Sequence, residues 1–241
     1  RPNLGVSTEL WVKLLEVCLE KAQAATSEEC SCTKWVMAGA YFAIGYVLGL
    51  RGPEGFMLEI KTMTKNQDLH GGLVWFPLVG NLKDLDQSPG VHFMRSVPIT
   101  NSAINIEYWR DLLLGLHKSA GRVEGPAFCD DDGRLMRYST MNFMLWEALK
   151  GLFETHSHLF PKVVDDPEKI KDLININRSM RRTSNSRATS AKVAIEVREV
   201  VDRWTERVQQ SRGQRTQVPL RLYYTEHEEL NDNFRRYTQA L

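Results

Sequence analysis

The stretch "TKWVMAGAYFAIGYVLGLRGPEG", residues 33–55, decides the expected fold. Residues 33–50 are almost entirely apolar or small, which is typical of a mostly buried helix, and the Gly-Pro pair that follows ends it. The apolar run is too short and too often interrupted by glycine to predict a membrane span. We therefore expect a buried helix that ends close to Arg51.

On the N-terminal side, residues 8–25 place apolar residues at helical spacing after Thr8, a suitable cap. On the C-terminal side the pattern changes to three strand candidates, which are "FMLEIKTM" (56–63), "GGLVWFPLVGNL" (71–82) and "HFMRSVPIT" (92–100). The link "KDLDQSPG" between the last two is typical of a hairpin turn. These segments predict a small three-stranded antiparallel sheet.

Helical patterns return over residues 106–120, 139–156, 168–191 and 193–210, and the last stretch begins extended before it becomes helical. Helices, a small sheet and more helices do not alternate as βαβ units do, which disfavours a Rossmann or barrel fold. We expect a mainly α chain of the α+β class. It would form one domain over 1–241, with 55–100 as the sheet insert and 211–241 as a C-terminal segment.

Composition fits one large domain, because 241 residues with 42% hydrophobic content can bury a substantial core. The four cysteines form no ligand pattern typical of a metal site, and they indicate a reducing intracellular compartment. The chain begins with Arg1, not Met, which suggests a fragment whose upstream part is missing. The net charge is only +1, so an electrostatic argument must rest on local clustering.

Positive charge is concentrated between Arg178 and Arg221, where eleven basic residues face four acidic ones, a local charge of +7. Within it, "NRSMRRTSNSRATS" (177–190) holds four arginines and no carboxylate. It could be a disordered tail, a kinase target at "RRTS", a nuclear-import signal or a phosphate-binding site. The apolar periodicity of both flanks favours a packed helix, and arginine is well suited to bidentate phosphate contacts.

Three separated pieces resemble, in this order, the catalytic domain of the tyrosine recombinases, the phage-integrase-like DNA breaking–rejoining enzymes. They are "GYVLGLRGPEGFMLEI" (45–60), "VWFPLVGNLKDLDQSPGVHFMRSVPIT" (74–100) and "INRSMRRTSNSRATSAKVAIEVREVVDRWTER" (176–207), the last followed by "RLYYTEH" (221–227). The segment "GPAFC…DG" and the ending "RRYTQAL" are similar to eukaryotic mobile-element members of this family. The resemblance covers nearly the whole chain.

The resemblance implies a set of site residues. The catalytic group would be Arg51, Lys83, Arg178, Arg181, Trp204 and Tyr224, with Glu54 in support and with Arg182, Arg187, Arg203 and Arg207 on the DNA. Arg178 stands where the family has a histidine. Tyr223 stays an alternative nucleophile, and Lys65 or Arg95 an alternative to Lys83.

The implied reaction is attack of the tyrosine phenol on a DNA phosphodiester, which leaves a 3′-phosphotyrosine link. Two guanidiniums would stabilise the negative charge that develops on the phosphate oxygens, and a lysine would protonate the departing 5′-oxygen. Trp204 could donate its indole N–H to a phosphate oxygen. No metal and no cofactor is needed.

The expected partners are double-stranded DNA and further copies of the chain on that DNA, with no membrane and no small-molecule cofactor, in the nucleus of a eukaryote. Two other hypotheses stay open. One is a degenerate DNA-binding protein derived from such a recombinase, and the other is a helical domain whose basic helix contacts an acidic protein partner.

Overall fold

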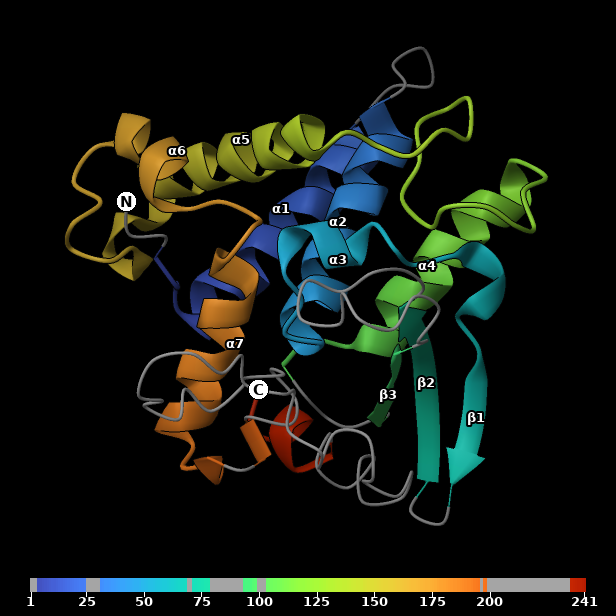
Figure 1. Cartoon of the computed structure of the whole chain (residues 1–241). Helices are drawn as coiled ribbons and strands as arrows, with labels where there is room; N and C mark the ends of the chain where they lie inside the picture. The colour runs from blue at the N-terminus through green and yellow to red at the C-terminus, as the bar shows by residue number, and fades with distance from the viewer. Residues whose placement is uncertain are drawn as a thin grey trace, which may run out of the picture.

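The computed structural model describes residues 4–24, 31–68, 71–78, 93–98, 103–195, 197–198 and 235–241. Helices make up most of these residues (Figure 1). The long helices are α1 (Thr8–Ala24), α2 (Ser31–Val47), α4 (Ile106–Ser119), α5 (Tyr138–His156) and α7 (Ser179–Ser190). The short ones are α3 (Gly52–Gly55), α6 (Ile170–Leu173) and the 3-10 turns η1 (Ile60–Thr62), η2 (Ser157–Leu159) and η3 (Pro167–Lys169).

The hydrophobic core is centred on α2, in which every residue from Val36 to Val47 is buried. The Trp11 indole of α1 donates to the Phe42 carbonyl at 3.2 Å and lies nearly parallel to the Tyr46 ring. On another face, a Cβ on Gly39 would lie only 2.4 Å from the Trp109 ring, so α4 packs on α2 where α2 has no side chain. The expected buried helix is confirmed.

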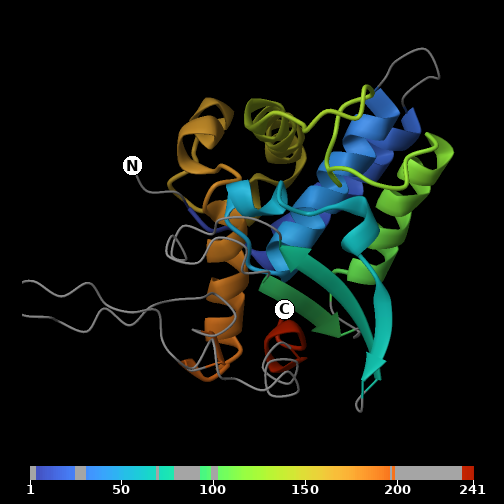
Figure 2. The same ribbon diagram turned by 45° about the vertical axis from the view of Figure 1, so that its right-hand side comes forward.

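The other helices surround this centre. α5 and α6 run across one end, α7 lies along one side, and the strands lie beyond α4 (Figure 1). The short C-terminal helix, residues 235–238, lies between α7 and the strands in both views (Figure 2). Among the residues that the structure describes, no helix is both long enough and apolar enough to cross a membrane.

The strand region requires a correction. Residues 56–63, expected as the first strand, contain the turn that follows α3 and then η1, and Glu59 alone among them forms an isolated bridge, to Pro126. Leu58 and Ile60 are buried, so their alternation reflects an irregular segment that packs on the core. The expected α+β class is therefore wrong for the described core, which is helical. The mainly α character is confirmed.

Pairing occurs further along the chain, between short strands. β1 (Lys65–Asp68), β2 (Gly71–Leu78) and β3 (Phe93–Pro98) pair antiparallel in that order. Lys65 lies opposite Val74, and Phe76 opposite Arg95. The turn predicted over 83–90 lies outside the described residues, and the division of the chain into a domain with a sheet insert stays a prediction.

A second correction concerns the helix expected over 168–191. The structure has η3 and α6, then a break, then α7. At the break the Asn175 backbone N–H donates to Ser179 Oγ at 3.1 Å, and the Asn177 backbone N–H donates to the Asn175 side-chain Oδ1 at 3.0 Å. Short polar side chains that bond nearby backbone compete with helix formation, so they end α6 and start α7. Most of 193–210 lies outside the described residues.

Candidate functional site

Arg51 lies in a tight connection between α2 and α3. Gly49 has φ 58°, a left-handed conformation that glycine adopts without strain, and the Leu50 amide bonds back to the Gly45 carbonyl at 2.8 Å. The Arg51 backbone N–H donates to Glu54 Oε2 at 2.9 Å. Glu54 is only 4% exposed, whereas Arg51 is half-buried. The carboxylate thus fixes the backbone that carries the arginine.

Gly52, directly after Arg51, is held from two sides. The Tyr41 hydroxyl of α2 donates to its carbonyl, and its own amide donates to the Asn177 carbonyl at 3.3 Å. Burial, with Tyr138 and Glu54 nearby, raises the pKa of the Tyr41 phenol well above its usual range, so the hydroxyl stays a donor. The second bond brings the Arg51 segment next to the residue that precedes Arg178.

One stripe of α5 holds the turn between α6 and α7. Trp146 Nε1 donates to the Ile174 carbonyl at 2.7 Å, and Asn142 Oδ1 accepts from the Ile176 amide at 3.0 Å. One turn further toward the start of α5, the Tyr138 ring lies 3.0 Å from where a Cβ on Gly52 would be. Residues four apart share a helix face, so one face of α5 contacts the α6–α7 turn at two levels and Gly52 at a third.

α7 carries the arginines of the basic stretch. Arg178 is the residue that caps its N-terminus and is exposed, and Arg181 is only 7% exposed. Arg182 and Arg187 are exposed. Burial raises the pKa of the Tyr46 phenol to about 12, and the charge of nearby Arg187 acts in the opposite direction. No acidic residue occurs from 173 to 195. The positive end of the helix dipole adds to the charge of Arg178.

The buried face of α7 is largely polar. The Val6 amide donates to Thr183 Oγ1 at 3.0 Å, and the Tyr237 hydroxyl donates to Ser184 Oγ at 3.2 Å. Both hydroxyl residues are fully buried. Met180 packs where Gly45 of α2 has no side chain. The packed helix is confirmed, and the exposed kinase target at "RRTS" is wrong for the folded chain, because Thr183 and Ser184 are inaccessible.

The structure therefore brings together the backbone segments of Arg51, Glu54, Arg178 and Arg181. Arg182 and Arg187 lie on α7, and the remaining expected site residues lie outside the described residues, namely Lys83, Trp204, Tyr223, Tyr224, Arg203 and Arg207. Lys65 forms ion pairs with Glu107 at 2.6 Å and Asp111 at 2.7 Å, and hydrogen bonds to both carboxylates raise its pKa. A lysine held in this way is a poor proton donor to a leaving group.

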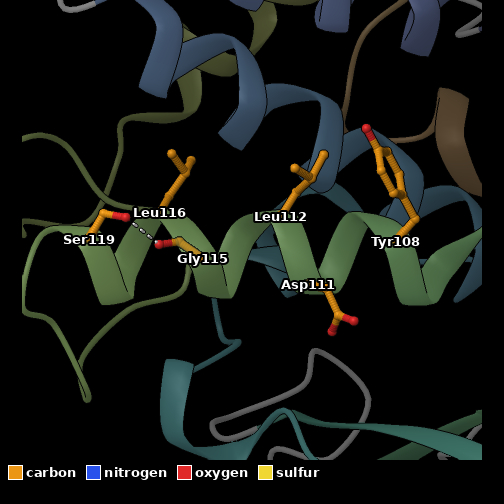
Figure 3. A pocket seen from close by; sticks show the side chains of 6 residues that line it. All are labelled: Tyr108, Asp111, Leu112, Gly115, Leu116 and Ser119. Atoms are coloured by element: carbon orange, nitrogen blue, oxygen red, sulfur yellow. Dashed lines mark hydrogen bonds between the residues drawn. The ribbon is translucent and has the colours of Figure 1, made fainter.

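Sequence reasoning missed the α5 stripe of Tyr138, Asn142 and Trp146. Its i, i+4, i+8 spacing is visible in the sequence, but nothing there shows that these side chains face the α6–α7 turn and Gly52. The structure also has an open groove along α4 (Figure 3). Its lining consists of Tyr108, Asp111, Leu112, Gly115, Leu116 and Ser119, none of which is an expected site residue.

Comparison with known proteins gives a likeness of fold. No family model and no curated protein matches the sequence. Among solved structures, FLP recombinase in complex with a Holliday junction matches with a TM-score of 0.50 at 14% identity, over 90% of this chain and 49% of that one. The chain spans about half the length of that recombinase. What the comparison shows is a recombinase-like fold.

Proposed function

We propose that the protein binds double-stranded DNA through the arginines of the Arg51 segment and of α7, and that it cleaves and rejoins the strands through a tyrosyl phosphodiester. The observation that carries the proposal is the hydrogen bond from the Gly52 amide to the Asn177 carbonyl. It joins two segments more than a hundred residues apart in sequence. Each carries an arginine directly beside the bonded residue.

These arginines suit a phosphate. Arg178 forms no ion pair with any described residue, and carboxylates are missing from the sequence around it. Glu54 Oε2 accepts from the Arg51 backbone N–H at 2.9 Å, which fixes the backbone that carries this arginine. Guanidiniums fixed by the surrounding fold stabilise the charge that develops on phosphate oxygens, because they need no reorganisation as the reaction proceeds.

The remaining roles rest on the family resemblance. Tyr224, or Tyr223 beside it, would attack the phosphorus and form the 3′-phosphotyrosine bond, while the 5′-oxygen leaves with a proton from Lys83. Trp204 would hold a phosphate oxygen, and Arg182, Arg187, Arg203 and Arg207 would contact the DNA backbone. Arg181 would pair with Arg51 on the reacting phosphate. Several copies would act together on DNA, in the nucleus of a eukaryotic host.

A second function is favoured by Arg178 itself. Arginine stays charged at all relevant pH, so it holds a phosphate but cannot exchange protons as the imidazole of the family's histidine would. This observation fits a recombinase-derived protein that binds DNA and no longer cuts it. Such a protein keeps the salt-dependent affinity of the proposed enzyme and lacks its covalent intermediate.

A nicked duplex that traps the covalent intermediate tests both. The full chain should form an adduct that survives denaturation, Tyr224→Phe should form none while it still binds DNA, and Tyr223→Phe should trap as the wild type does. The reverse pattern would move the nucleophile to Tyr223. Binding without any adduct would leave the non-cutting function, and no affinity for duplex DNA at low salt would overturn both in favour of an acidic protein partner.

A further inference from the structure

Three backbone segments meet at Gly52, and two of them are those already described. The third is the start of α5, where the Tyr138 ring edge and the Ile176 carbonyl both lie 3.0 Å from the position of a Gly52 Cβ. The Asn177 Cα lies 3.1 Å from the same position. Each of the three segments has an arginine next to one residue at this meeting point, because Arg51 precedes Gly52, Arg137 precedes Tyr138 and Arg178 follows Asn177.

Arg137 resembles Arg178 in its surroundings. Both are exposed and both occupy the N-cap position of a helix, Arg137 for α5 and Arg178 for α7. Neither forms an ion pair with a described residue. The first turn of α5 holds no acidic residue. A second arginine nearby in sequence is different, because Arg134 has a side chain 78% exposed and pairs with Asp132 at 3.1 Å.

The place of Arg137 relative to Arg178 is fixed by the α5 stripe. Trp146 and Asn142 each form a hydrogen bond to backbone in the α6–α7 turn, and Tyr138 adds its ring at Gly52. These three contacts along one face hold α5 against the α6–α7 turn and against Gly52. The start of α5 is therefore held beside the other two segments.

We propose that Arg137 is a further phosphate-contacting residue of this site, and that Tyr138 is the positioning residue that holds it there. The partner is the sugar–phosphate backbone of duplex DNA, so the inference rests on the proposed function. It extends the site from two chain segments to three. The added contact gives no sequence preference, because phosphates are the same at every base pair.

The test is the salt dependence of binding by the full chain to a labelled duplex, measured by fluorescence anisotropy. Loss of one phosphate contact lowers the slope of log K against log salt by about 0.9. We expect that reduction in Arg137→Ala and the wild-type slope in the matched control Arg134→Ala. Tyr138→Ala should also lower the slope, and Tyr138→Phe should restore it, because the ring edge and not the hydroxyl meets Gly52.

The outcomes separate this inference from the proposed function. If the wild type binds and Arg178→Ala weakens binding while Arg137→Ala keeps the full slope, Arg137 does not contact a phosphate and only this inference is overturned. If the wild type shows no affinity for duplex DNA, both are overturned. Arg137 is exposed, so we expect Arg137→Ala to fold, and its result decides the inference even where Tyr138→Ala is unstable.

Discussion

α2 and α7 lie against each other and are held in opposite ways. From Val36 to Val47 every residue of α2 is buried, and nearly all of these residues are apolar or aromatic. The buried residues of α7 are Ser179, Met180, Arg181, Thr183, Ser184 and Ala188. Apolar area fixes the first helix, whereas hydrogen bonds to the N-terminal segment and to the C-terminal helix hold the second.

The difference matters for the site. Burial of apolar area is not directional and tolerates small shifts, whereas a hydrogen bond fixes one atom against another. Because Arg178 stands at the N-cap of α7 and Arg181 lies in its first turn, the polar contacts of α7 set where the backbone of both arginines lies. α2 supplies stability, and the contacts of α7 supply position. Changes in the two helices should therefore have different consequences.

The largest loss in the free energy of unfolding should come from the apolar residues of α2. Phe42→Ala removes a fully buried ring at the centre of the core, and substitutions of this kind cost about 3–5 kcal/mol in the free energy of unfolding. Denaturant unfolding measures it, with Phe143→Ala as the control because Phe143 is 59% exposed. Equal losses in the two variants would contradict the location of the core.

A smaller loss in the free energy of unfolding should come from the polar contacts of α7. Thr183→Val keeps the shape of the side chain and removes the acceptor of the Val6 amide, and a buried donor without its acceptor costs about 1–3 kcal/mol. Ser186→Ala, on the exposed face of α7, is the control. We further expect Thr183→Val to weaken DNA binding more than Phe42→Ala does under conditions where both are folded. The opposite order would show that the contacts of α7 do not set position.

The smallest effect concerns how stability depends on pH, through a histidine buried in the apolar core. His117 of α4 is fully buried, with Nε2 2.8 Å from the Ala127 carbonyl oxygen, and burial lowers its pKa, helped by nearby Arg122. The unfolded chain then takes up its proton first, so stability present above about pH 6.5 is lost as the pH falls toward the lower folded pKa. His117→Gln, which does not titrate, should flatten this decline in thermal unfolding between pH 7 and pH 5. An unchanged slope would show that another group causes it.

Much of the helical part could be predicted from the sequence. The patterns over 8–25, 33–50, 106–120 and 139–156 correspond to α1, α2, α4 and α5 apart from their ends. Each is long enough for the apolar period to dominate over local effects. The same signal failed over 56–63, because burial of Leu58 and Ile60 produces a strand-like alternation in a segment that packs on the core and pairs only through the isolated bridge at Glu59.

The site could be predicted only in part. Charge and the family resemblance indicate Arg51 and Arg178, but their proximity depends on the hydrogen bond between the Gly52 N–H and the Asn177 carbonyl. Because both groups belong to the backbone, the residue types do not reveal that they pair. The break before α7 depends on Asn175 and Asn177, whose side chains suit a helix poorly but do not by themselves show where it ends. The Tyr138 contact requires the fold.

The buried hydroxyls of α7 have a consequence for enzymes that modify proteins. A kinase that recognises "RRTS" needs an extended, accessible substrate, and in the native protein Thr183 and Ser184 are enclosed by Val6 and Tyr237. Phosphate can therefore be added only when α7 has detached from its neighbours. The rate at which a purified kinase phosphorylates the native protein would therefore measure local opening of α7, without a label on the protein.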